Sequence, residues 1–185
     1  MFRAFVAVIV FTLLACIEPG NSNQETQTQP ADTKVKAADT ELTARLYSLY
    51  FSDPKNQAEL DQNALLDYAV DNGLDVTRTP TGLFYIIHKE GQGELMKKGQ
   101  PCSAHYTGYF LDGKIFDTSQ KKGKPINFNI GAMNAGWNEG LLYMNVGTKA
   151  QLLLPSHLGY GQRGFPGFIP PNTPIIFDIE IMPLG

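Results

Sequence analysis

The sequence predicts an α+β domain in which a curved antiparallel sheet wraps around one short helix, with a short helical extension before it. Two observations lead to this expectation. Apolar and polar residues alternate with a period of two over 104–110 and again over 177–181, as in strands with one face in water. The second half of the chain has one stretch with helical spacing, residues 134–144, so a single helix is available to cover the sheet.

The chain begins with an apolar run that is typical of an export signal. Residues 5–15 are almost continuously apolar and follow Arg3, but they are fewer than the ~20 that a membrane-spanning helix needs. Residues 13–16 (LLAC) resemble a bacterial lipobox, whose cysteine is acylated. We expect residues 1–15 to be a lipoprotein signal peptide and Cys16 to carry a lipid such as palmitate. The protein would then be exported and anchored to the bacterial cell envelope; the alternative is a buried first helix with an incidental cysteine.

A polar segment and two short helices are expected next. Residues 16–38 are predicted to be a disordered tether, since they are mostly polar residues and helix breakers. Residues 39–79 are predicted to be the helical extension, with Thr40 as the first cap, a stop at Asp53-Pro54, and a second end at Asn72-Gly73. Their apolar stripes are short, so these helices either pair two copies as a homodimer or pack on their own chain and cover a sheet edge.

The compact domain is predicted over residues 80–185, where most of the glycines and prolines separate strand-like segments. Asp112-Gly113 indicates a tight turn between two strands. Asn134 is the expected N-cap of the one helix, whose apolar face includes Trp137. Further strands are expected at residues 82–88, 114–118, 125–130 and 149–155.

Composition disfavours several function classes. The formal net charge of -3, with no basic block, argues against a nucleic-acid partner. Cys16 and Cys102 are too few for a zinc site built from thiolates, and the sequence has no P-loop or dinucleotide motif, so neither metal nor cofactor is expected. None of the 3 histidines lies in a nucleophile-elbow context. The sequence therefore disfavours covalent, metal and phosphoryl chemistry.

A series of short strings, in order, carries a family resemblance. They are HYTG at 105–108, GKIFDTS at 113–119, GWNEG at 136–140, GYG at 159–161, IPPNT at 169–173 and FDIE at 177–180. They resemble the successive motifs of FKBP-type peptidyl-prolyl cis-trans isomerases, from residue 82 to the C-terminus. The resemblance implies the FKBP fold, rotamase activity on X-Pro bonds, and proline-containing polypeptide clients whose folding is assisted. The lipoprotein signal and helical extension are also similar to those of exported bacterial members.

The resemblance further implies a catalytic set: Tyr106, Phe116, Asp117, Trp137, Tyr160 and Phe177. Trp137 would form the floor of an apolar pocket between aromatic walls. Tyr160 would donate its hydroxyl to a substrate carbonyl, and Asp117 would lie at the rim. Neighbouring side chains on a strand point to opposite faces, so Phe116 and Asp117 reach one cavity only if a bulge or bend interrupts the strand.

The implied substrate-binding set is Phe128, Met133, Asn134, Phe165, Phe168 and Ile169. Met133-Asn134 stands where the family usually has a Val-Ile pair, although Asn134 still supplies a backbone N–H donor. Phe165 and Phe168 replace smaller or polar residues. We expect these departures to affect binding of the family's macrolide ligands more than catalysis.

Two other functions remain as alternatives to the isomerase. The first is an exported proline-binding chaperone module with little or no turnover, which the aromatic residues Phe165 and Phe168 and the helical extension favour. The second is a structural surface lipoprotein with a degenerate cleft, which the intact Phe116-Asp117 pair and Trp137 disfavour.

Overall fold

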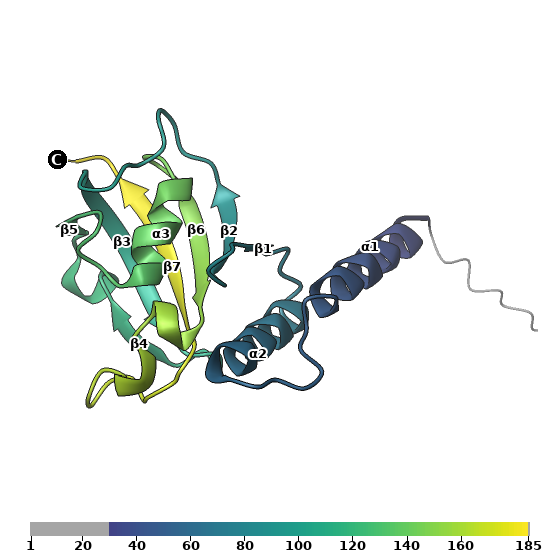
Figure 1. Ribbon diagram of the computed structural model, residues 1–185. Helices are drawn as coiled ribbons and strands as arrows, with labels where there is room; N and C mark the ends of the chain where they lie inside the picture. Colours follow the sequence, from purple (N-terminus) through teal and green to yellow (C-terminus); the bar gives the residue numbers. More distant parts are fainter. Residues whose placement is uncertain (1–29, 185) are drawn as a thin grey trace, which may run out of the picture.

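An antiparallel sheet organises the molecule, and the computed structural model describes it within residues 30–184. The 7 strands lie in the order β1-β2-β6-β7-β3-β4, with β5 also paired to β3 (Figure 1). Their bounds are β1 Thr77–Arg78, β2 Phe84–Lys89, β3 Pro101–Tyr109, β4 Ile115–Thr118, β5 Ile126–Asn129, β6 Lys149–Leu154 and β7 Ile175–Met182. The predicted α+β class and the longer strands are confirmed, whereas the two-residue β1 was not predicted because it is too short to show alternation.

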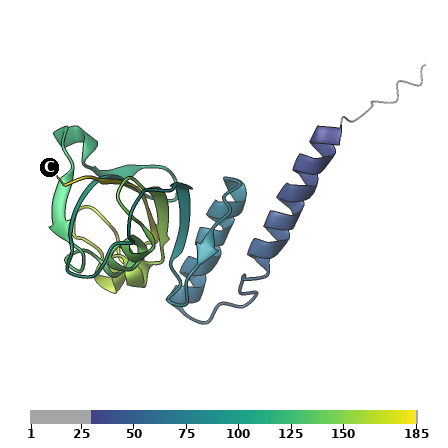
Figure 2. The ribbon, with the colours of Figure 1, turned by 90° about the horizontal axis from the view of Figure 1, so that it is seen from above.

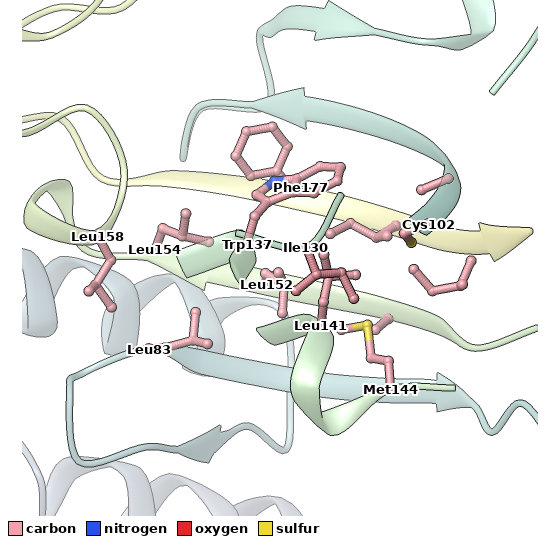
Figure 3. Close-up of a cluster of buried hydrophobic side chains, with 14 of the residues drawn as sticks. Leu83, Cys102, Ile130, Trp137, Leu141, Met144, Leu152, Leu154, Leu158 and Phe177 are labelled. Atoms are coloured by element: carbon pink, nitrogen blue, oxygen red, sulfur yellow. The ribbon is translucent and has the colours of Figure 1, made fainter. Parts of the chain in front are cut away.

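One face of the sheet packs against α3 (Ala135–Gly140), which continues into the 3₁₀ turn η2 (Leu141–Tyr143). Asn134 is the N-cap as predicted, and its Oδ1 accepts a hydrogen bond from the Trp137 backbone N–H at 2.9 Å. A Cβ on Gly136 would meet Leu154 Cδ2 at 2.5 Å, so the absence of a side chain lets α3 lie directly on β6. Figure 3 shows Trp137 and the surrounding leucines in the resulting core.

The other face of the sheet is partly covered by α2 (Gln57–Asp71). Asn56 caps this helix by accepting from the Glu59 N–H at 3.1 Å, and the helix ends at the predicted Asn72-Gly73. A second apolar cluster lies between α2 and the sheet; its buried members are Leu46, Leu65, Leu66, Ala69, Val76, Phe84, Leu153 and Ile176. The extension therefore packs on its own chain, over a face of the sheet and not only along an edge.

Helix α1 (Pro30–Tyr47) begins inside the segment predicted as a disordered tether, 16–38, and that prediction is wrong from Pro30 onward. Proline suits the first turn of a helix because it lacks a backbone N–H, and an N–H there would have no partner within the helix; the Ala and Lys residues that follow favour helix. Thr40 accordingly lies within α1 and is not its cap, and the helix ends at Tyr47, before the predicted stop. Figure 2 shows α2 between α1 and the sheet.

The predictions for the first residues lie outside the described part of the chain. These are the signal peptide at 1–15, the lipidated Cys16 and the tether up to residue 29. Within residues 30–184, no helix has both the length and the apolar character that crossing a membrane requires.

Candidate functional site

Trp137 lies at the base of an aromatic cluster where α3 faces the sheet (Figure 3). Only 1% of its surface is exposed. Ring centroids of Tyr106, Phe177 and Phe128 lie 5.4, 5.3 and 5.7 Å from its own, each with an edge-to-face arrangement. Such arrangements are favourable for aromatic pairs and leave little freedom to the rings. Trp137 is therefore a buried member of the core that packs against the aromatic rings of the predicted site.

The strand β4 contains the irregularity that the predicted site requires. In its pairing with β3, Gly108 lies opposite Asp117 and Tyr109 lies opposite Ile115, so Phe116 is an extra residue without a partner. A bulge of this kind turns consecutive side chains away from their usual opposite faces. Phe116 and Asp117 accordingly line the same cavity, as expected.

This cavity has a volume of about 250 Å³. Its lining brings together members of both predicted sets: Phe116, Asp117, Tyr160, Phe165, Phe168 and Ile169. Two contacts join it to the aromatic cluster around Trp137. The Phe116 ring lies 5.6 Å from that of Phe177, edge to face, and the Tyr106 hydroxyl donates to the Asp117 carboxylate.

The lining of the cavity combines apolar side chains with the hydroxyl of Tyr160 and the carboxylate of Asp117. Burial is the main reason that the pKa of Tyr160 is raised; the charge of Asp117 raises it further, and a hydrogen bond with the Asn134 side chain lowers it in part. Burial also raises the pKa of Tyr106, with the hydrogen bond and charge of Asp117 adding to this effect. Both hydroxyls therefore keep their protons at neutral pH, and Tyr160 is available as a donor.

The loop after Tyr160 presents two aromatic rings to solvent. Phe165 is 49% exposed and Phe168 is 62% exposed, and their rings stack at 5.2 Å. Phe165 also lies 5.8 Å from Tyr160, so the pair forms a shelf at the mouth of the cavity. Ile169, by contrast, is a buried member of the cavity lining.

Six of the predicted residues do not line this cavity: the catalytic candidates Tyr106, Trp137 and Phe177, which form the adjoining aromatic cluster, and the substrate-binding candidates Phe128, Met133 and Asn134. Phe128 packs against Trp137, and Met133 is half-buried against the main core. Asn134 has a positioning role, since its side chain caps α3 and reaches Tyr160. Its backbone N–H has no hydrogen-bond partner among the described residues, which leaves it free to donate to a ligand.

Sequence reasoning missed two residues that shape the site. Ser119 Oγ accepts from the Tyr106 N–H at 2.9 Å and fixes the strand that carries this tyrosine. Gly108 is needed because a Cβ there would meet Phe177 Cε1 at 2.6 Å and Phe116 at 2.7 Å. Both lie within the HYTG and GKIFDTS strings, which was the signal available for them.

The described residues hold no group of three His, Cys, Asp or Glu side chains placed to bind a metal ion. The groups that the cavity presents are aromatic side chains, the Tyr160 hydroxyl and the Asp117 carboxylate, to which the Tyr106 hydroxyl donates.

Comparisons with known proteins agree with this geometry. The sequence model of the family described as FKBP-type peptidyl-prolyl cis-trans isomerase matches residues 92–182. A probable FKBP-type peptidyl-prolyl cis-trans isomerase of Haemophilus influenzae is 40% identical over 110 residues, which are 60% of this chain and 46% of that protein. FK506-binding protein 1 of Debaryomyces hansenii is 43% identical over 99 residues, 52% of this chain and 88% of that protein.

A solved structure extends the similarity to the helical extension. The crystal structure of FkpA from Escherichia coli superimposes with a TM-score of 0.60 at 29% identity, over 86% of this chain and 73% of that one. This chain spans about half the length of the Haemophilus influenzae relative. Because the match to the Debaryomyces hansenii protein covers 88% of that protein at 43% identity, and the family model spans the residues that line the cavity, the chain belongs to the family of FKBP-type peptidyl-prolyl cis-trans isomerases.

Proposed function

We propose that this chain accelerates cis-trans rotation about X-Pro bonds in polypeptides by enclosing the bond in the aromatic cavity. The barrier to this rotation is about 18–20 kcal/mol because resonance gives the peptide C–N bond partial double-bond character. No covalent bond has to break. A site that binds the twisted state more tightly than the planar state gains tenfold in rate for each ~1.4 kcal/mol of difference.

Each part of the cavity contributes to that difference. Water stabilises the planar, polarised amide by hydrogen bonding to its oxygen, so transfer into an apolar cavity favours the less polar twisted state. Phe116 supplies apolar surface for the prolyl ring, and Phe177 and Trp137 pack behind it. Tyr160 and the Asn134 N–H act as donors that orient substrate carbonyls. Asp117 adds a fixed negative charge beside the rotating bond.

The observation that carries this proposal is the bulge at Phe116. It turns an aromatic ring and a carboxylate, adjacent in sequence, into one cavity. Packing alone does not require this, since a regular strand would bury the ring and leave the carboxylate on the opposite face. The comparisons likewise favour an isomerase over the alternative of a chaperone module without turnover.

The proposal is tested by measuring isomerisation of a short X-Pro peptide with the full chain and with Phe116→Ala. We expect acceleration by the wild type and at least a tenfold lower kcat/KM for the variant, which is ~1.4 kcal/mol of lost transition-state stabilisation. Ile115→Ala is the matched control, because Ile115 is the preceding residue and is 53% exposed. Full activity in folded Phe116→Ala would contradict the pocket assignment, and a folded wild type without activity would refute the isomerase.

We also propose export and lipid anchoring, on the sequence of residues 1–16 alone. The short apolar run and the LLAC string support removal of residues 1–15 and acylation of Cys16. Mass spectrometry of the protein from its bacterial host would detect the acylated N-terminus. Cys16→Ser should abolish acylation and release the protein from the membrane fraction. A wild-type protein whose mass equals that of the unprocessed, unmodified chain would refute the anchor.

A homodimer through the N-terminal helices is the remaining proposal about partners. Exposed aromatic and aliphatic side chains near the end of α1 and on α2 support it: Tyr47, Tyr50, Phe51 and Leu60. Light scattering of the full chain measures the state directly. We expect the wild type to be a dimer and the double variant Tyr47→Ser, Leu60→Ser to be a monomer. A monomeric wild type would contradict the proposed homodimer.

A further inference from the structure

A buried carboxylate joins the helical extension to the segment that leads to the cavity. Asp61, in α2, is only 2% exposed. Its Oδ2 accepts a hydrogen bond from the backbone N–H of Ser156 at 2.7 Å, across 95 positions of sequence. Its Oδ1 accepts from Gln57 Nε2 at 2.7 Å. Both carboxylate oxygens thus have donors, and one of these donors lies outside the extension.

Packing alone does not account for a carboxylate at this position. Burial of a charged group is unfavourable unless hydrogen bonds replace its lost water. Asp61 forms no ion pair with a described cation. An alanine or leucine would supply apolar contact at lower cost, so the feature that only a side chain such as Asp61 provides is a directional acceptor for Ser156.

Ser156 begins a short run of turns that ends at the cavity. It starts the 3₁₀ turn η3 (Ser156–Leu158), in which the Leu158 N–H donates to Pro155 O at 3.0 Å and the Gly159 N–H donates to Ser156 O at 3.0 Å. Leu158 is held in the main core. Tyr160 then caps the next turn, η4 (Gly161–Arg163), and its carbonyl accepts from the Gly164 N–H at 3.1 Å. Only Gly159 and Tyr160 lie between the two turns, and each is tied to one of them by a backbone hydrogen bond, so the position of Tyr160 depends on that of Ser156.

We propose that Asp61 is a positioning residue for Tyr160, so that helix α2 of the extension supports the geometry of the isomerase cavity. This inference rests on the proposed function, because it assigns Tyr160 a role in turnover. Asp61 contacts no residue that lines the cavity, and it acts only through the hydrogen bond to Ser156.

A double-mutant cycle in the full chain tests this role. Asp61→Ala should lower kcat/KM for an X-Pro peptide about fivefold in the wild type, and by less than about 1.5-fold in a Tyr160→Phe background, because residues that act as a unit are not additive. Asp61→Asn should retain near-wild-type activity, since the amide oxygen of Asn can take the place of Oδ2 and accept from the Ser156 N–H, while the Gln57 amide can turn its oxygen toward the new NH₂ group. Equal losses from Asp61→Ala in both backgrounds would overturn the proposal.

Gln62→Ala is the matched control for a general effect of loosening α2. Gln62 is 6% exposed, and its amide hydrogen-bonds to Leu49 O and to Arg78, away from Ser156. We expect this variant to lose stability but to keep kcat/KM within about 1.5-fold of wild type. If Gln62→Ala lowers kcat/KM as much as Asp61→Ala does, then any destabilisation of α2 lowers turnover, and the positioning role of Asp61 would be rejected.

Amide hydrogen exchange separates this inference from the proposed function. Exchange at residues 156–160 should be faster in Asp61→Ala than in wild type, and unchanged in Asp61→Asn and Gln62→Ala. If Asp61→Ala does not fold, protection of the Ser156 amide in wild type and in Asp61→Asn still tests the contact; an unprotected Ser156 amide would overturn it. A folded wild type without turnover would refute the isomerase itself, while the exchange result would still show whether the Asp61 contact exists.

Discussion

The Tyr106 hydroxyl donates a hydrogen bond to the carboxylate of Asp117, which joins the aromatic cluster to the rim of the cavity. The Thr118 N–H donates to the other oxygen of Asp117 at 2.9 Å. Both donors fix the carboxylate in place, and neither is a cation. Asp117 is therefore held as an oriented negative charge, and its place in the cavity suggests an electrostatic effect on the substrate amide and not proton transfer.

This arrangement predicts a graded effect of Asp117→Asn. The amide oxygen can still accept one of the two hydrogen bonds, but the charge is lost. We expect kcat/KM to fall about tenfold, which corresponds to ~1.4 kcal/mol, with KM changed less than kcat. Peptide isomerisation kinetics measure both, and Asp112→Asn, an exposed acid in the neighbouring turn, is the control. An unchanged rate would remove Asp117 from the site, whereas complete loss would indicate a more direct role.

Gly108→Ala should disturb the cavity from the strand opposite Phe116. The new Cβ would meet Phe177 Cε1 at 2.6 Å and Phe116 Cε2 at 2.7 Å, so at least one ring has to move. Overpacking of this kind costs about 1–3 kcal/mol of unfolding free energy. Denaturant unfolding should show that loss, and peptide turnover should fall with it. Thr107→Ala, on the opposite face of β3, should leave turnover unchanged; wild-type stability and turnover in Gly108→Ala would contradict the close packing.

Local patterns were sufficient to predict the sheet, the single covering helix and its cap. Alternation over 177–181 places the apolar side chains of β7 on the core face, where Ile179 pairs with Tyr106. The bulge at Phe116 has no such local signal, because the sequence around it still reads as a strand. It was expected only through the family resemblance, which also supplied the residues of the cavity.

Contacts between distant segments could not be predicted from the sequence. The hydrogen bond from Ser156 to Asp61 spans 95 positions, and neither residue has a neighbouring pattern that indicates it. The start of α1 was misjudged for a different reason. The polar composition of residues 16–38 predicts a tether, whereas Pro30 lies in the first turn of α1, where proline is favourable.

Burial of Cys102 predicts a loss of stability at alkaline pH. This thiol is fully buried, and desolvation raises its pKa from 9.0 to about 11. Between these values the unfolded chain releases its proton while the folded chain keeps it, so the folded state becomes less stable as pH rises. By about pH 10.5 the loss should be ~2 kcal/mol.

Denaturant unfolding of wild type and Cys102→Ala at pH 8 and at about pH 10.5 measures the loss of unfolding free energy that the Cys102 thiol causes. Tyr106 and Tyr109, whose pKa values are also raised by burial, titrate in both proteins and cancel in the comparison. The wild type should therefore lose ~2 kcal/mol more than Cys102→Ala over this interval. Equal losses would show that the thiol is not desolvated in the folded chain.

The aromatic shelf of Phe165 and Phe168 should select among substrates without stabilising the fold. Both rings are largely exposed, and a change at such positions usually alters stability by less than ~0.5 kcal/mol. A substrate side chain next to proline gains about 0.5–1.5 kcal/mol from contact with an aromatic ring, or roughly two- to tenfold in kcat/KM. We expect the double variant Phe165→Ser, Phe168→Ser to reduce the preference for Phe-Pro over Ala-Pro peptides by that factor.

Isomerisation kinetics on the two peptides give the ratio of their kcat/KM values. The control is Leu95→Ser, since Leu95 is 53% exposed and lies outside the cavity lining. An equal fall for both peptides would show that the rings order the loop and do not contact the substrate.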